Sequence, residues 1–233
     1  MEELHRQYIS SGRPHCPLQW RDLWRIHEDM SFFVIASGPS CNMINIKAEA
    51  EKSDIIIGTN WIWVKFPDVR FDYLFCCDVA PLLDAPDGIK VLTTANTEGG
   101  RVERIPARPF CILPHYGKKM WAPPEKGKPL SDSYNSGFGA MNLAAYMGAR
   151  AIKVVGMDFA DDGKSYHCYE DSKLHAGSGR NSEEIRKDFE KQYRINNFER
   201  VNMHLGAFIE WARKVRIVME NLSPITALNF NPA

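Results

Sequence analysis

The sequence lacks the signals that mark several common classes of protein. No stretch approaches the roughly 18 consecutive apolar residues of a membrane-spanning helix, and the polar residues 1–15 contain no apolar signal-peptide core. Basic and acidic residues balance at 29 each, so the net charge favours neither a membrane surface nor nucleic acid as a partner. These absences predict a cytoplasmic protein without a membrane span.

Standard site motifs are also absent. The six cysteines form no CxxC pair, which argues against a zinc ribbon or a thioredoxin motif and predicts reduced, mostly buried thiols. Cys76 and Cys77 are adjacent on a predicted strand and point to opposite faces, so they should not bridge each other. The chain contains no GxGxxG fingerprint, no Walker GxxxxGK[ST] loop and no GxSxG elbow.

What is present is enough apolar sequence for one large core. With 233 residues, 44% hydrophobic and 25% charged, residues 1–233 are expected to form a single domain. Short apolar runs that end in polar residues predict an α/β fold with a doubly wound, mostly parallel sheet flanked by helices. Strands are expected over residues 32–36, 54–58, 73–77, 89–93, 110–113, 151–155 and 215–219.

Helical spacing of apolar residues occurs near both ends of the chain. Residues 1–30 are interpreted as an N-terminal helical arm, with a helix over 17–30 whose tryptophans serve as packing anchors. Residues 182–209 have the pattern of one long or two consecutive amphipathic helices. Between the two, residues 94–132 are interpreted as a basic, proline-rich insertion or lid, and its segment 101–128 interleaves cations with aromatics. A solvated basic surface is the simpler interpretation of this part, and a loop that closes over substrate is the alternative.

The stretch from Ser133 to Tyr169 contains a loop, a small-residue helix, a buried strand and a polar loop. Ser136 can cap the helix, and Gly148 stands where a glycine commonly ends one. Ligands of open α/β sheets lie beyond the carboxyl ends of the strands. The polar residues after this strand, Asp158 among them, are therefore expected to take part in chemistry.

Other predicted strands end in the same way. A glycine turn that leads into a helix offers unpaired backbone amides to a phosphate, and two such turns, at Gly38 and Gly137, can hold a nucleotide between them. A purely structural use of these turns is the alternative. A second helix, over residues 42–51, is expected after the first turn, with Ser40 as its cap. The candidate nucleotide-binding residues are Ser37, Gly38, Pro39, Ser40, Asn60, Asp78, Asn135, Ser136 and Gly137.

Carboxylates and histidines follow Asp158 closely. Asp158, Asp161 and Asp162 are of the type that binds magnesium or manganese near phosphates, although Asp161-Asp162-Gly163 is also an ordinary turn, the favoured interpretation. No metal ligand is therefore assigned, and no tightly bound cofactor is expected. Asp158 is the first candidate catalytic residue. His167 and His175 are candidate general bases, with surface or packing roles as the alternative.

Five motifs occur in a familiar order: SGPS at 37–40, TN at 59–60, NSG at 135–137, GMDF at 156–159 and DGKSY at 162–166. In these motifs the chain resembles bacterial CMP-sialic acid sialyltransferases and the related motility-accessory-factor and hydroxymethylpterin-pyrophosphokinase-like superfamily. The resemblance covers about residues 32–224 and is concentrated in the motifs.

The resemblance implies a Rossmann-like fold and a glycosyltransferase that uses a nucleotide-sugar donor in an inverting, single-displacement reaction. Residues 37–40 would contact the donor phosphate, and Asn60 and Asp78 would line the sugar side. Asn135 to Gly137 with Asp158 would hold the nucleotide, and Tyr166 matches a tyrosine that stabilises the leaving phosphate.

Acceptor and reaction type leave alternatives open. The acceptor is expected to be a glycan or a hydroxymethylated DNA base, the latter approached through the basic segment 101–128. A pterin-type diphosphotransferase that uses ATP and magnesium is the second hypothesis. A non-catalytic nucleotide-binding module is the third.

Overall fold

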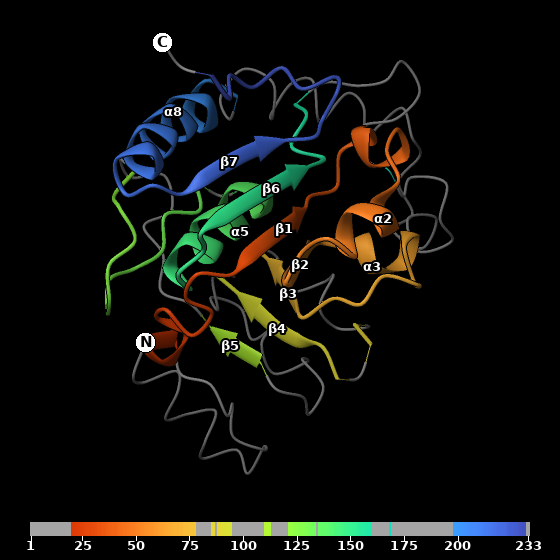
Figure 1. Cartoon of the computed structure of the whole chain (residues 1–233), viewed down its shortest axis with the longest axis horizontal. Coiled ribbons are helices and arrows are strands. Elements are labelled where there is room, and N and C mark those ends of the chain that lie inside the picture. Colours follow the sequence, from red (N-terminus) through yellow and green to blue (C-terminus); the bar gives the residue numbers. More distant parts are fainter. Residues whose placement is uncertain are drawn as a thin grey trace, which may run out of the picture.

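The computed structural model describes residues 20–77, 85–86, 88–94, 110–112, 121–133, 135–159, 168 and 198–231. Within these residues a seven-stranded sheet has the order β5-β4-β3-β2-β1-β6-β7, and every neighbouring pair is parallel (Figure 1). The expected doubly wound α/β sheet is thus confirmed, in a single-domain arrangement consistent with a Rossmann-like fold. The strands are β1 (Ser31–Ile35), β2 (Ile55–Thr59), β3 (Tyr73–Cys76), β4 (Lys90–Thr93), β5 (Phe110–Ile112), β6 (Ala151–Val155) and β7 (Val218–Asn221).

Helices cover both faces of the sheet, which is why nearly every residue of its central strands β1, β2 and β3 is buried. Phe32 and Val34 of β1 belong to a core shared with α5 (Ser136–Tyr146) and α8 (Phe198–Lys214). Phe33 and Ile35 belong to a second core, shared with α2 (Ile46–Ala50) and α3 (Ile62–Lys65), which lie next to each other in Figure 1. Side chains that alternate along β1 therefore enter opposite layers.

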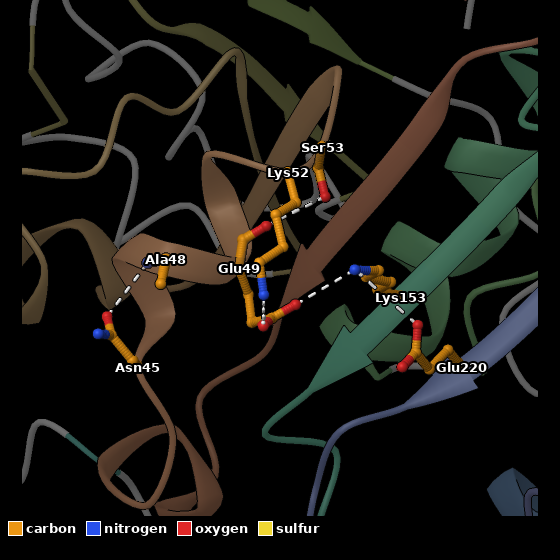
Figure 2. A network of polar contacts seen from close by, with 7 residues as sticks. All are labelled: Asn45, Ala48, Glu49, Lys52, Ser53, Lys153 and Glu220. Carbon is orange, nitrogen blue, oxygen red and sulfur yellow. Dashed lines mark hydrogen bonds and ion pairs between the residues drawn. The ribbon is translucent and has the colours of Figure 1, made fainter.

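Lys153 is the one charged residue of β6, and a network of ion pairs explains its place there. Its ammonium lies 3.2 Å from Glu49 of α2 and 3.9 Å from Glu220 of β7 (Figure 2). Lys52 also bonds Glu49, and the hydrogen bonds from Lys52 and Lys153 lower the pKa of Glu49. The network links α2 to the strands β6 and β7, at the margin of the second core.

The N-cap of helix α5 lies one residue earlier than the sequence predicts. Asn135 is the N-cap, because its side chain accepts a 2.8 Å hydrogen bond from the amide of Phe138, so the expectation that Ser136 caps the helix is wrong. The other end agrees with expectation. Gly148 follows the C-cap with φ +94°, a conformation that favours glycine.

Two predicted helices are shorter or broken in the structure. Over the described residues 20–30, a single 3-10 turn (Trp20–Leu23) replaces the expected helix, and Arg25 and Asp29 have positive φ. Instead of one helix over 42–51, the chain forms a 3-10 turn, η2 (Pro39–Asn42), and then α2, whose cap is Asn45 rather than Ser40. The tryptophans Trp20 and Trp24 do pack against Tyr146 of α5, as anchors.

The C-terminal strand lies later than predicted. α8 continues to Lys214, and β7 starts at Val218 instead of residue 215. Arg216 has φ +66°, which turns the chain between the two elements. β7 pairs only with β6 in the described sheet and has no fully buried residue. A run of apolar residues therefore does not predict where this strand begins.

In the part of the chain that the structure describes, no helix has both the length and the apolar character needed to span a membrane.

Candidate functional site

The strand order reverses between β1 and β6, and the segments that follow these two strands pack tightly together. The carboxylate of Asp158, 2% exposed, accepts a 2.8 Å hydrogen bond from the backbone amide of Ser40. The amide of Gly38 donates to the carbonyl of Gly156 at 2.8 Å. The topological switch point, where ligands of such sheets bind, is thus built from the SGPS and GMDF motifs.

Gly38 is needed at this point because of close approach. Its φ of −71° suits any residue, but a Cβ there would lie 2.5 Å from the Asp158 carboxylate and 2.6 Å from the Gly156 carbonyl. Gly137 has a similar role, since a Cβ on it would lie 2.7 Å from Cγ of Met157. Both glycines therefore bring protein segments together.

A chain of polar side chains crosses the carboxyl ends of β1, β2 and β3. Cys76 donates from its thiol to Oδ1 of Asn60 at 2.9 Å, and Nδ2 of Asn60 donates to Oγ of Ser37 at 3.2 Å. On the other side, Ser136 at the start of α5 lies 3.9 Å from the Cys76 sulfur and accepts a 3.0 Å bond from the Cys77 amide. We refer to Ser136, Cys76, Asn60 and Ser37 as the polar chain.

A second polar group lies beside the polar chain, at the ends of β3 and β4. Asp132 is fully buried and accepts a 2.6 Å hydrogen bond from the hydroxyl of Thr94. The thiol of Cys77 lies 3.7 Å from the same carboxylate oxygen. Burial, and then the Asp132 charge, raise the pKa of Cys77, so this thiol stays protonated at neutral pH.

Two hydroxyls at the same strand ends are buried without a hydrogen-bond partner among the described residues. They belong to Ser40 and to Thr59, both with no exposed surface. An unsatisfied buried hydroxyl costs about 1–3 kcal/mol. Such groups are uncommon in stable cores, and two at one sheet edge agree with a functional location.

The structure brings most of the predicted nucleotide-binding residues to one edge of the sheet. Ser37 to Ser40, Asn60, Asn135 to Gly137 and Asp158 all follow β1, β2 or β6 or open α5. Ser37 is 8% exposed, and Asn60 and Ser136 are partly exposed. Four candidates, with the two further aspartates, lie outside the described residues: Asp78, Tyr166, His167, His175, Asp161 and Asp162.

Sequence reasoning missed several residues at this edge. The cysteine pattern predicts only buried thiols at Cys76 and Cys77, yet Cys76 ends β3 and Cys77 follows that strand as Asn60 follows β2. The same rule of polar strand ends, applied to them, would have found both. Cys168 was also missed: its amide donates to the Ser37 carbonyl at 2.9 Å, which brings residue 168 to the switch point.

The described residues contain neither a cluster of metal-binding side chains nor a histidine placed at the carboxyl ends of the strands. Within them, no group of three or more His, Cys, Asp or Glu side chains is close enough to hold a metal ion. His204 of α8 is buried and its pKa is lowered by burial and then by Arg200, so it is neutral at pH 7. It packs against Phe138 of α5, a packing contact inside the helix layer.

No family model and no curated protein matches this sequence. The fold and the site define the class of the protein. It is an α/β protein with a parallel, doubly wound sheet and a polar cluster at the carboxyl ends of the strands, beside the switch point.

Proposed function

We propose that this protein is a glycosyltransferase that moves a sugar from a nucleotide-activated donor to an acceptor hydroxyl. The observation that carries the proposal is the meeting of the SGPS, TN and NSG motifs at one sheet edge, linked by the polar chain. These are three of the five motifs on which the family resemblance rests. A donor across this edge would place its phosphates beside Ser37 and the start of α5.

The chemistry follows from what such a reaction needs. In a single displacement, the acceptor hydroxyl attacks the anomeric carbon as the bond to the phosphate oxygen breaks, so negative charge grows on the departing phosphate. Hydrogen-bond donors already in place stabilise that charge. Ser37 and Asn60 are such donors here, and Tyr166 is proposed as another. His167 or His175 would accept the proton of the acceptor hydroxyl.

Asp158 takes a different part in this proposal. Its carboxylate already holds the Ser40 amide, so its first effect is to shape the loop after β1 against the loop after β6. The acceptor is proposed to be a glycan or a hydroxymethylated DNA base, and the donor needs no tightly bound cofactor, with magnesium or manganese as an optional partner of the phosphates.

A thermal-shift screen tests the proposal. CMP-, UDP- and GDP-sugars and ATP, each with and without magnesium, are added to the wild type, to Ser37→Ala and to the exposed control Asp68→Ala. A ligand at 100 times its Kd stabilises the fold by about 2.7 kcal/mol, which raises Tm by roughly 5–10 °C in a chain of this size. We expect the largest rise in Tm with one sugar nucleotide. That nucleotide should raise the Tm of Ser37→Ala by less, and the Tm of Asp68→Ala by as much as that of the wild type.

Other outcomes would redirect the assignment. The largest shift with ATP and magnesium would favour the diphosphotransferase. Binding of a sugar nucleotide that is never consumed, with any acceptor, would favour a non-catalytic module. No shift with any nucleotide would contradict the proposal.

A further inference from the structure

We infer that Cys76 is a positioning residue that fixes the side-chain amide of Asn60 and so makes Ser37 a hydrogen-bond donor toward an anionic oxygen of the ligand. This inference rests on the proposed function for the identity of the ligand. It assigns to the site a residue that neither the motifs nor the family resemblance includes.

The directions of two hydrogen bonds fix the orientation of the Asn60 side-chain amide. An asparagine amide can donate from its nitrogen and accept at its oxygen, and the two ends look alike to a neighbour that can do both. Cys76 Sγ lies 2.9 Å from Oδ1 of Asn60, and Nδ2 lies 3.2 Å from Ser37 Oγ. With the thiol as donor, the amide oxygen is used on the Cys76 side, and the NH₂ group must face Ser37.

Ser136 keeps the thiol proton of Cys76 directed at Oδ1 of Asn60. The hydroxyl of Ser136 accepts from the Cys77 amide at 3.0 Å, so its own proton is free to point at the Cys76 sulfur, 3.9 Å away. The Cys76 sulfur then accepts from Ser136 and donates to Asn60. Burial of Cys76, with no exposed surface, protects the arrangement from water.

The consequence falls on Ser37. Its oxygen accepts from Asn60, so its proton points elsewhere, and Ser37 retains 8% exposed surface at the strand end. The second N–H of the Asn60 amide is also directed away from Cys76, and Asn60 is partly exposed. The chain thus ends in donors, which suit an acceptor-only group. A phosphoryl oxygen is such a group, whereas a sugar hydroxyl would satisfy either polarity.

The backbone of Asn60 supports a fixed role for its side chain. Asn60 has φ +54°, a conformation that asparagine tolerates better than most residues. Its position directly after β2 places the amide between β1 and β3, the two strands that β2 pairs with. The backbone and the two side-chain bonds together hold the amide in one orientation.

Binding of inorganic pyrophosphate by calorimetry tests the inference in four proteins: the wild type, Cys76→Ala, Cys76→Ser and Cys77→Ala. Cys76→Ser keeps a donor toward Asn60, whereas Cys76→Ala removes it. Cys77→Ala is the neighbouring control, because the thiol of Cys77 contacts Asp132 and Ser136 rather than Asn60. Thermal midpoints without ligand show that each variant is folded.

We expect Cys76→Ala to weaken binding about five- to tenfold, the effect of one lost hydrogen bond, with Cys76→Ser and Cys77→Ala within about twofold of the wild type. Equal affinity of Cys76→Ala and the wild type would overturn the inference and leave the proposed function standing.

Absence of pyrophosphate binding in the wild type would count against the proposed function, and a second measurement then decides the inference. The side-chain NH₂ resonances of Asn60 are recorded by NMR in the same proteins and in Ser37→Ala. Resonances that move in Cys76→Ala and Ser37→Ala, but stay in Cys77→Ala, support the orientation. Asn60 resonances that are unchanged in Cys76→Ala would overturn the inferred orientation.

Discussion

The carboxylate of Asp158 and the backbone amide of Ser40 are joined by a 2.8 Å hydrogen bond that spans 118 residues of sequence. The bond connects the loop after β6 to the loop after β1, at the point where the strand order reverses. It gives Asp158 a structural role at the site that is independent of any reaction.

Replacement of Asp158 by alanine should destabilise the protein. The change leaves the buried Ser40 amide without its acceptor, and a buried unsatisfied group costs about 1–3 kcal/mol. Urea unfolding of Asp158→Ala should show a free energy of unfolding lower by that amount. Asp68→Ala, at an exposed position, should differ from the wild type by less than about 0.5 kcal/mol. An unchanged stability of Asp158→Ala would show that the bond to Ser40 contributes nothing.

Two glycine substitutions should have opposite effects. Gly38→Ala places a methyl group 2.5 Å from the Asp158 carboxylate, and overpacking of this kind costs about 1–3 kcal/mol. Gly206→Ala meets no atom within 4 Å and lies inside α8, where alanine is favoured over glycine by about 0.5–1 kcal/mol. Thermal unfolding should therefore shift down for the first and up for the second. Shifts of the same sign would contradict the packing at the switch point.

Stability should fall as pH falls below neutrality, because two histidines are held neutral. Burial, and then the Lys90 charge, lower the pKa of His27, whose Nε2 lies 2.7 Å from the Tyr73 hydroxyl; burial of that hydroxyl raises the pKa of Tyr73 to about 12. His204 is shifted in the same direction. The unfolded chain therefore binds protons more readily than the folded protein.

The sign follows from that difference in proton binding. The stabilisation is complete above the unfolded histidine pKa of about 6.5 and is lost as pH falls from there through the lower folded pKa. Urea midpoints between pH 5 and pH 8 should rise with pH, and His27→Gln together with His204→Gln should flatten the rise. A slope that is unchanged in the double variant would refute the assignment to these histidines.

Loss of the helix cap should weaken α5. Asn135→Ala removes the acceptor for the Phe138 amide and should lower the free energy of unfolding by about 1 kcal/mol. Asn135→Asp keeps an acceptor and should retain most of the stability. Chemical denaturation of the two variants compares them directly, and equal losses in both would mean that the cap hydrogen bond is not what stabilises this position.

Strands were predictable where burial on both faces makes the sequence continuously apolar. β1 and β6 were placed within one residue, because Phe32 to Ile35 of β1 and the apolar residues of β6 fill both cores, whereas Lys153 of β6 forms ion pairs. The helix predicted over residues 17–30 is wrong over its described part, 20–30. Apolar spacing does not reveal the positive φ of Arg25 and Asp29, a conformation that a continuous helix excludes.

The site was predictable only in part. Ser37, Asn60 and Asp158 follow strands and could be found from sequence. Their partners could not, because Ser40 pairs with Asp158 and Cys76 with Asn60 through contacts fixed by the order of the strands. The order, and with it the switch point between β1 and β6, comes from long-range packing that no local pattern encodes.

A crystal structure with the sugar nucleotide that gives the largest thermal shift tests the central claim most directly. We expect a phosphate oxygen within about 2.7–3.2 Å of Ser37 Oγ and of Asn60 Nδ2, with the nucleoside toward the start of α5. A nucleotide bound elsewhere on the protein, with Ser37 and Asn60 free of it, would contradict the account.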